Sequence, residues 1–282
     1  PRVYRENRVP LTLPRAQTAR SVVVVGGGPA GLKAALTAAQ RGHQVTLVEQ
    51  SGALGGLMIP ASVGAFKEDL RRYLSYLRRQ VEKSQIHVML HTRADRALLE
   101  HLHPDAVILA VGGRAVMPPV PGLGTSGAVQ AVALLNAGLE TAGTRVTILG
   151  GGSIGCELAL ELAALDRMVT VVELRDKLAA NGNELYRQDL MLHLEQETRI
   201  TILTQTVCTG VTAQGCTVRE KDGGTRVIPH DTFVIAAGLR ADADAVEALY
   251  GVVPETYYVG DCKRAASITE ATTEAYFLGA SL

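Results

Sequence analysis

Several residue types are scarce in this chain, and their scarcity narrows what it can be. It contains no tryptophan, and aromatic residues make up only 4% of its 282 positions. Its 28 basic and 28 acidic residues balance, so the composition lacks the excess of positive charge that is typical of a protein that binds nucleic acid or an anionic membrane. No apolar run reaches the length that spans a bilayer, and no signal peptide is visible. We therefore expect neither a nucleic-acid partner nor a membrane partner.

Cysteine is also scarce, with four residues that show neither C-x-x-C nor any metal-ligand spacing: Cys156, Cys208, Cys216 and Cys262. This usage predicts free thiols in a reducing, cytoplasmic environment and no metal site. His101 and His103 lack further ligand candidates in the sequence around them. We interpret them as a surface pair rather than as metal ligands.

Glycine, in contrast, is abundant, and one glycine pattern occurs twice. A hydrophobic run at 22–25 leads into G-x-G-x-x-G at 26–31, and a run at 146–149 leads into the same pattern at 150–155, which is 124 residues later. In such a motif the first glycine makes a tight turn, the second lets a phosphate approach the backbone, and the third allows close helix–strand packing. These glycines are Gly26, Gly28 and Gly31 in the first copy and Gly150, Gly152 and Gly155 in the second.

Each copy is followed by a strand that closes with an acidic residue. These residues are Glu49 (VTLVE) and Glu173 (VTVVE), again 124 positions apart. An acidic residue about 20 positions after the motif accepts a hydrogen bond from a ribose hydroxyl, while the helix N-terminus offers N–H groups to the pyrophosphate. Two copies, each between a strand and a helix, predict two dinucleotide sites.

The organisation of the chain follows from this duplication. Aliphatic strands with small turn residues predict an α/β fold with two Rossmann-like, three-layer (ββα) dinucleotide-binding domains, the second inserted in the first. Residues 1–19, with three prolines and several arginines, predict a linker or arm, and a chain that begins inside a linker is expected to be a fragment. The segment 256–282 has no counterpart in the second copy, so we expect it to return to the first domain. The expected boundaries are 20–124 with 240–282 for the first domain and 125–239 for the second.

Periodicity predicts the principal elements between the motifs. Helices are expected at 32–40, 67–83, 96–102, 156–165 and 183–197, and an antiparallel β-meander at 207–211, 217–220 and 225–229. The segment 52–64 is predicted to be an irregular loop. The outer face of the helix at 67–83 carries Arg71, Arg72, Arg78 and Arg79. We interpret this face as solvated, with a docking surface for a missing partner as the alternative.

The order of the motifs resembles the flavoproteins with two dinucleotide-binding domains, the superfamily of the pyridine nucleotide-disulphide reductases. The matching segments are GGGPAG at 26–31, LAVGG at 109–113, GGGSIG at 150–155, IAAG at 235–238 and VGD at 259–261. The resemblance implies FAD in the first site, with Gly260 and Asp261 near the ribityl and phosphate region, and NAD(P)H in the second. Motifs and resemblance together give the following cofactor-binding residues: Gly26, Gly28, Pro29, Ala30, Gly31, Glu49, Gly55, Gly56, Leu57, Ala110, Gly112, Gly260 and Asp261 for FAD, and Gly150, Gly152, Ser153, Ile154, Gly155, Glu173, Ala237 and Gly238 for NAD(P)H.

A closer resemblance is to the family of 2,4-dienoyl-CoA reductase, enoate reductase and trimethylamine dehydrogenase. It is carried by the stretch from Pro1 to Glu6, where Tyr4 replaces a family glycine, by LGGLM at 54–58, PDAVILAVGG at 104–113 and GDCKRAASITEATTEAY at 260–276. In that family an N-terminal TIM barrel of Old Yellow Enzyme type carries FMN, and a cysteine cluster holds a 4Fe–4S centre. The resemblance therefore implies that this chain is the C-terminal half of such an enzyme, with the barrel and iron–sulfur region as its partner. The implied function is the passage of hydride from NAD(P)H to FAD, for which no catalytic side chain is expected.

Some alternatives stay open at this point. No redox cysteine pair follows the first motif, which argues against disulfide reductase chemistry, and we interpret Cys156 and Cys262 as packing residues. Glu173 favours NADH because a carboxylate repels a 2′-phosphate, although the nearby Arg175 leaves NADPH as the second choice. Trimethylamine dehydrogenase holds ADP in its first site, so a redox-inactive nucleotide-binding domain is the alternative function. A stand-alone NADH oxidase or ferredoxin reductase is the third.

Overall fold

The computed structural model describes residues 13–180 and 182–282, and the chain divides into two compact units. Unit 1 contains the described residues up to Ile59, together with Glu68–Arg114 and Arg240–Leu282, and unit 2 contains Pro60–Lys67 and Ala115–Leu239. Residues 13–20 form neither helix nor strand. The arm expected at 1–19, with the family stretch from Pro1 to Glu6, lies outside the described residues for its first twelve positions.

Unit 1 is built on a five-stranded parallel sheet. Its strands, in spatial order, are β15 (Thr256–Tyr258), β4 (Ala106–Leu109), β1 (Ser21–Val25), β2 (Gln44–Val48) and β3 (His87–Met89). The edge strand β15 comes from the C-terminal segment, which therefore returns to this sheet and pairs with β4. A parallel sheet of this kind is covered on both faces, and the strands are accordingly almost continuous runs of valine, leucine and isoleucine.

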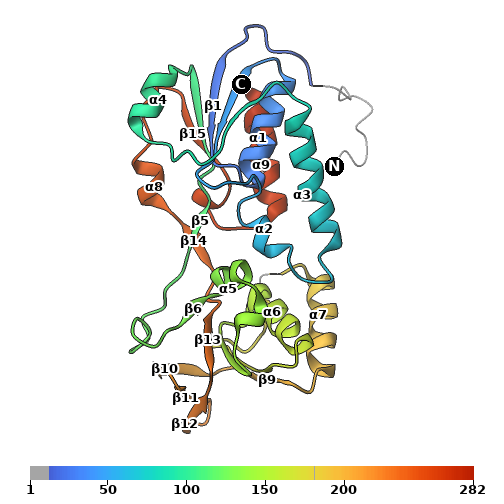
Figure 1. Ribbon diagram of the computed structural model, residues 1–282, viewed down its shortest axis with the longest axis vertical. Helices are drawn as coiled ribbons and strands as arrows, with labels where there is room; N and C mark the ends of the chain where they lie inside the picture. The colour runs from blue at the N-terminus through green and yellow to red at the C-terminus, as the bar shows by residue number, and fades with distance from the viewer. Residues whose placement is uncertain (1–12, 181) are drawn as a thin grey trace. The chain divides into compact units, whose positions relative to one another are not determined.

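Helices cover both faces of that sheet. Val22 and Val24 of β1 face α1 (Pro29–Gln40), α3 (Glu68–Glu82) and α9 (Ile268–Ser281), while Val23 and Val25 face the side of α4 (Arg96–Leu102) and α8 (Ala243–Glu247). Figure 1 shows α1, α3 and α9 on one side of the strands and α4 and α8 on the other. Because side chains alternate along a strand, one run of four valines supplies both layers of the core.

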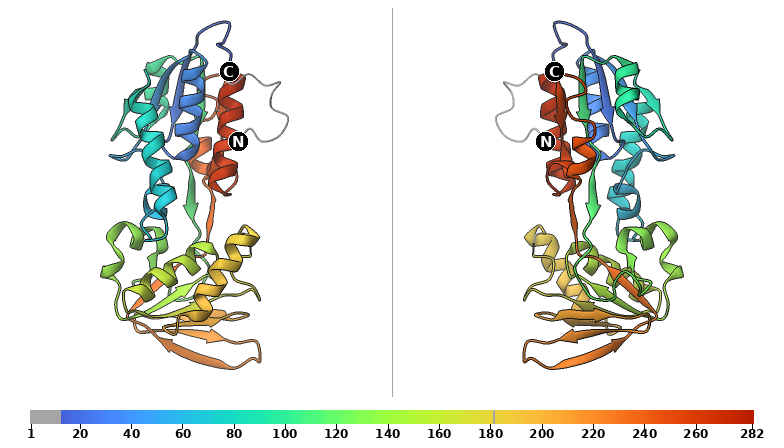
Figure 2. Two further views of the ribbon diagram at one scale, coloured as in Figure 1. Left: turned by 90° about the vertical axis from the view of Figure 1, so that its right-hand side faces the viewer. Right: turned by 90° about the vertical axis from the view of Figure 1, so that its left-hand side faces the viewer.

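Unit 2 repeats the sheet of unit 1 with a different covering layer. Its parallel sheet has the order β6 (Val129–Gln130), β13 (Thr232–Ile235), β7 (Arg145–Leu149), β8 (Met168–Val172) and β9 (Ile200–Leu203). One face packs against α5 (Ala131–Ala137), α6 (Ser153–Ala164) and α7 (Glu184–Gln196), with the 3₁₀ helix η2 (Leu139–Thr141) beside them. The other face packs against an antiparallel meander of β10 (Val207–Val211), β11 (Gly215–Arg219) and β12 (Thr225–Pro229), as Figure 2 shows.

The two sheets share one topology. In each, the strand before the glycine motif pairs with the strand after it in matching register, Val25 with Val48 and Leu149 with Val172, and the next strand in sequence, β3 or β9, continues outward on the same side. The α/β class with two Rossmann-like sheets is thus confirmed. The second face is covered by helices in unit 1 and by the meander in unit 2. Where the chain passes from one unit to the other, the short strands β5 (Gly113–Ala115) and β14 (Leu239–Ala241) pair with each other.

Most predicted elements lie within a few residues of the observed ones, and several short elements were missed. The helix at 96–102 is confirmed with its predicted bounds, and the meander strands 207–211 and 225–229 likewise. The predicted irregular loop at 52–64 contains the short helix α2 (Met58–Ala61), and neither β9 nor α5 was predicted. Among the described residues, no helix combines the length and the apolar character needed to cross a bilayer.

Candidate functional site

The first glycine motif forms a turn that only glycine can make. Gly26 has φ +106°, and a Cβ placed on it would lie 2.3 Å from the carbonyl oxygen of Ala110. A Cβ on Gly31 would lie 1.8 Å from the carbonyl oxygen of Gly26, so α1 packs directly on the turn. Gly28 differs: the nearest atom to a Cβ there is the Cα of Gly56, at 4.0 Å. The first and third glycines are therefore required by packing, whereas a Cβ on the second would only touch the backbone of Gly56.

The second motif has the same geometry. Gly150 has φ +114° and its Cβ would lie 2.4 Å from the carbonyl oxygen of Ala236, while a Cβ on Gly155 would lie 2.0 Å from the carbonyl oxygen of Gly150. No atom lies within 4 Å of a Cβ placed on Gly152. Both motifs thus leave backbone open at the one glycine where a pyrophosphate must approach.

The helices that follow the two motifs lack side-chain caps. The N-cap residues are Gly28 for α1, followed by Pro29 at the first helical position, and Gly152 for α6, and no side chain accepts a hydrogen bond at either end. Four other helices of the described chain are capped by side chains: α4 by Asp95, α7 by Asn183, α8 by Asp242 and α9 by Ser267. Helix α5, which directly continues β6, is also uncapped. The first-turn N–H groups of α1 and α6 are left for an external acceptor, which an anion supplies best.

The first acidic residue fixes its own glycine loop. The carboxylate of Glu49 is 7% exposed, and its Oε2 accepts a hydrogen bond from the N–H of Gly27 at 2.6 Å. Its Oε1 accepts a second bond from the N–H of Ser51 at 2.7 Å. Each carboxylate oxygen retains a second lone pair, so the carboxylate can still accept from a ribose hydroxyl.

Glu173 makes the same two contacts in unit 2. Its Oε2 accepts from the N–H of Gly151 at 2.6 Å, and its Oε1 accepts from the N–H of Arg175 at 2.8 Å. The side chain of Arg175 is exposed. Ribose binding by the two glutamates remains a prediction, to which the structure adds a loop-fixing role that the sequence did not suggest.

Sequence reasoning missed a further layer around the first loop. The N–H of Gly55 donates to the carbonyl of Gly27 at 2.7 Å, so the LGGLM loop closes over the glycine turn. The guanidinium of Arg78, on α3, donates through Nε to the carbonyl of Leu54 at 2.7 Å. The interpretation of the α3 arginines as a solvated face is therefore wrong for Arg78, which anchors the loop.

Unit 2 has a matching layer, whose loop residues lie at the offset of 124 residues while its anchoring arginine does not. The N–H of Ala179 donates to the carbonyl of Gly151 at 2.8 Å, and Nε of Arg187, on α7, donates to the carbonyl of Leu178 at 2.9 Å. Ala179 has φ +46°, a conformation that costs energy for a residue with a Cβ. The repeat of Leu54-Gly55-Gly56 as Leu178-Ala179-Ala180 was the available signal, since the offset is that of the motifs.

Among the other predicted residues of unit 1, Gly56 and Gly260 lie against the first turn of α1. Gly56 has φ +52° and its Cβ would lie 2.9 Å from the Cα of Gly28, while the Cβ of Gly260, with φ +72°, would lie 2.9 Å from the Cβ of Ala30. Gly112, with φ +76°, has open space around its Cβ position. Asp261 follows Gly260 in the 3₁₀ helix η3 (Gly260–Cys262) and accepts from the N–H of Ala266 at 3.2 Å, and burial raises the pKa of its carboxyl.

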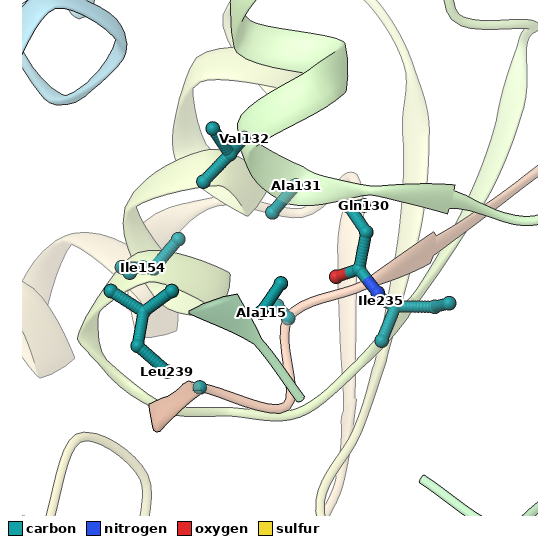
Figure 3. Close-up of a pocket in the computed structure, with 9 residues that line it drawn as sticks. Ala115, Gln130, Ala131, Val132, Ile154, Ile235 and Leu239 are labelled. Atoms are coloured by element: carbon teal, nitrogen blue, oxygen red, sulfur yellow. The ribbon is translucent and has the colours of Figure 1, made fainter. Parts of the chain in front are cut away.

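In unit 2 a small hollow opens where the strands β6 and β13 end (Figure 3). Among its lining residues, the amide of Gln130 lies on one side in this view and the side chains of Ile154 and Leu239 lie on the other. Gly238 and Ala236 also line it, whereas Ser153 and Ala237 do not. Strand β7 has β8 on one side and β13 on the other, so the switch point of the sheet, where doubly wound folds bind ligands, is beside β13, the strand at whose end the hollow opens.

The cysteines and histidines behave as structural residues. Cys156 is fully buried and donates to the carbonyl of Gly151 at 3.4 Å, and burial followed by the charge of Glu173 raises its pKa to about 12. Cys262 is 4% exposed and donates to the carbonyl of Val259 at 3.1 Å, and burial raises its pKa. Both are neutral thiols in packed surroundings, as predicted. His101 and His103 are exposed, and no three metal-ligating side chains gather within 13–180 and 182–282.

The fold and the two glycine turns at 26–31 and 150–155, called cradles from here on, define a protein with two dinucleotide-binding units. The chain belongs to the pyridine nucleotide-disulphide oxidoreductase family, whose model matches residues 20–275. It is accordingly an FAD- and NAD(P)-binding oxidoreductase domain.

Individual relatives agree with this membership. The chain is 34% identical over 266 residues to the bilirubin reductase of Mediterraneibacter gnavus and 29% identical over 266 residues to the cinnamate reductase of Clostridium sporogenes. Each match covers 94% of this chain but only 41% and 39%, respectively, of the relative. The structure of a 2-naphthoyl-CoA reductase matches 96% of this chain and 41% of its own, with a TM-score of 0.91 and 25% identity. The resemblance to dienoyl-CoA and enoate reductases is thereby confirmed.

Proposed function

We propose that this chain passes hydride from NAD(P)H to FAD, with FAD held by unit 1 and NAD(P)H by unit 2. The observation that carries the proposal is the duplicated glycine turn: Gly28 and Gly152 both have room for a Cβ without a clash, and each is the N-cap of a helix that no side chain caps. When bound, the nicotinamide supplies a hydride and the flavin accepts it at N5, a transfer that needs no acid or base from the protein. The tasks left to the chain are binding, orientation and exclusion of water.

In unit 1, the residues present fit an FAD. The N–H groups of the first turn of α1 would hold the pyrophosphate, Glu49 would accept from the adenosine ribose, and Gly56 leaves the LGGLM loop close to Gly28. Asp261 is half-buried at the start of the C-terminal helical segment and would meet the ribityl region. A carboxyl with a raised pKa in this place can donate or accept a hydrogen bond according to pH.

In unit 2, the residues fit a nicotinamide nucleotide. Glu173 lies two positions before the exposed Arg175 and would bind a free ribose 2′-hydroxyl, which favours NADH over NADPH. The apolar walls of the hollow, formed by Ile154 and Leu239, would shelter the nicotinamide end, while the amide of Gln130 offers both a donor and an acceptor.

We further propose that the chain works as the C-terminal part of a longer cytoplasmic enzyme of the enoate or dienoyl-CoA reductase type. The support is the coverage: two relatives named as reductases extend well beyond the 41% and 39% of their length that this chain spans. The remaining part would carry the FMN barrel and the 4Fe–4S centre that the resemblance implies. Mass spectrometry of the full-length source protein, showing about 350–400 residues ahead of Pro1, would support this arrangement, and a product that begins near Pro1 would refute it.

The hydride transfer itself is tested by absorption spectroscopy on the purified chain. We expect a yellow protein whose flavin band is bleached by NADH under anaerobic conditions, and bleached less readily by NADPH. A colourless protein that retains ADP would instead make it a redox-inactive nucleotide-binding domain. A yellow protein that NADH does not bleach would leave unit 1 as a flavin site and remove the assignment of unit 2.

A further inference from the structure

Two cysteines of the meander are neighbours in the apolar layer between the meander and the parallel sheet of unit 2. Cys208 is on β10 and Cys216 is on β11, and both belong to the apolar cluster between the meander and the parallel sheet. Their thiols are hydrogen-bonded to each other. Cys208 is 8% exposed and Cys216 is fully buried. Cys208 also donates to the carbonyl of Gly210 at 3.7 Å, as Cys156 and Cys262 donate to the carbonyls of Gly151 and Val259. What sets Cys208 apart is the hydrogen bond that it shares with a second thiol, that of Cys216.

The backbone around this pair is irregular. Cys208 lies opposite Val218 and Val211 lies opposite Cys216, so the two cysteines are diagonal neighbours in the ladder. The register shifts between Cys208 and Gly210, and this bulge leaves Thr209 as an extra residue on β10. A bulge interrupts the ladder and lets its strand bend. Cys208 can therefore approach Cys216 without breaking the pairing of β11 with β12.

We propose that Cys208 and Cys216 form a redox-active dithiol that closes to a disulfide when it meets hydrogen peroxide. The Cys208 sulfur attacks one peroxide oxygen, the O–O bond breaks, and one water leaves, giving Cys208 sulfenic acid. The Cys216 sulfur then attacks the Cys208 sulfur, the S–O bond breaks, and a second water carries away the oxygen with the thiol proton. Two thiols lose two electrons in total, and one peroxide becomes two waters.

The surroundings assign the two roles. The hydrogen bond from the Cys216 thiol lowers the pKa of Cys208, against the effect of burial, so Cys208 holds the sulfur that ionises more readily. The same hydrogen bond and burial raise the pKa of Cys216. Thr147 of β7 supplies a further side-chain hydrogen bond to Cys216. Cys208 is also the more exposed of the two, so a small oxidant reaches it first.

Thiol mapping on the purified, cofactor-loaded chain tests the proposal. The protein is exposed to hydrogen peroxide, quenched, alkylated under denaturing conditions and mapped by mass spectrometry. We expect the loss of two of the four free thiols, and a linked peptide joining Cys208 to Cys216 while Cys156 and Cys262 remain alkylated. In Cys216→Ser, dimedone is expected to trap a sulfenic acid at Cys208, and in Cys208→Ser the other thiols are expected to stay reduced.

Cys262→Ser is the matched control, because it removes a buried thiol that has no thiol partner, and it should form the linked peptide as the unaltered chain does. Circular dichroism before and after treatment confirms that the fold is kept in each sample. The proposal is overturned if all four thiols are alkylated after peroxide treatment of the folded protein. It is equally overturned if Cys156 and Cys262 are oxidised alongside Cys208, since that pattern is unselective damage.

Discussion

Replacing Gly152 by alanine separates ligand binding from folding in unit 2. Gly152 has φ −68° and ψ 176°, an extended conformation that alanine adopts readily, and no atom lies within 4 Å of the new Cβ. The free protein should therefore fold normally and keep its melting temperature. The methyl group would nevertheless project into the space that the pyrophosphate must enter if α6 binds one.

The expected loss can be estimated from the cost of forcing an extra methyl into a filled site, which is about 1–3 kcal/mol. That cost corresponds to roughly a fivefold to 150-fold rise in KM for NADH. Steady-state reduction of ferricyanide gives KM, and thermal unfolding followed by circular dichroism checks stability. Gly124→Ala is the matched control, because its Cβ also meets no atom within 4 Å and it lies outside both motifs. A Gly152→Ala protein with an unchanged KM would refute the assignment of NADH to this cradle.

Gly28→Ala is the mirror experiment in unit 1. The backbone of Gly28, at φ −72° and ψ −178°, also suits alanine, and the nearest atom to the Cβ lies at 4.0 Å. We expect this variant to fold and to lose bound flavin on gel filtration, with the flavin absorption per protein as the readout. If Gly28→Ala instead raised KM for NADH and Gly152→Ala released the flavin, the two cofactors would have been assigned to the wrong units.

Three further outcomes follow from packing, loop anchoring and charge. Gly155→Ala should lower the free energy of unfolding by an amount at the upper end of about 1–3 kcal/mol, because its Cβ would lie 2.0 Å from a backbone oxygen. The melting temperature should fall by roughly 5–10 °C, and an unchanged melting temperature would contradict the close packing. Arg187→Met removes the bond to the loop beside the second motif, and it should raise KM for NADH about fivefold and leave the flavin content unchanged. Arg78→Met should weaken flavin retention by a similar factor and leave KM for NADH unchanged. Equal effects of both variants on both readouts would argue against separate anchors. The bonds from Arg145 lower the pKa of Asp231 from 3.8 to about 2, so the stability they add is present above pH 3.8 and is lost as pH falls towards 2. The difference in melting temperature between the unaltered chain and Asp231→Asn should therefore close across that window. A difference that does not depend on pH would exclude this ion pair as its cause.

The sequence predicted the glycine cradles well because their requirements are local. Gly26 and Gly150 need a positive φ, and a Cβ on Gly31 or Gly155 would collide with the carbonyl oxygen of the first glycine of the same motif. Such constraints act within a few residues of the motif, and a pattern in the sequence therefore reveals them. Glu49 and Glu173 could be found for the same reason, since each closes the strand next to its motif.

The loop anchors were missed because tertiary packing decides them. Spacing along α3 places Arg78 among the polar residues of that helix, and nothing in the sequence shows that the carbonyl of Leu54 lies within reach of it. The strand β9 and the helix α5 were missed for another reason. Both are short apolar segments, ITIL and AVALLNA, whose periodicity does not distinguish a strand from a helix.

The edge strand that pairs with β4 in unit 1 and with β13 in unit 2 sets the order in which the chain can fold during synthesis. In unit 2 that strand is β6, which leaves the ribosome before the rest of its sheet, so this sheet is complete once β13 has emerged. In unit 1 the same place is taken by β15, and the helix α9 that packs on α1 follows it. A nascent chain thus completes the sheet of unit 2 first, and the sheet of unit 1 stays incomplete until β15 has also emerged.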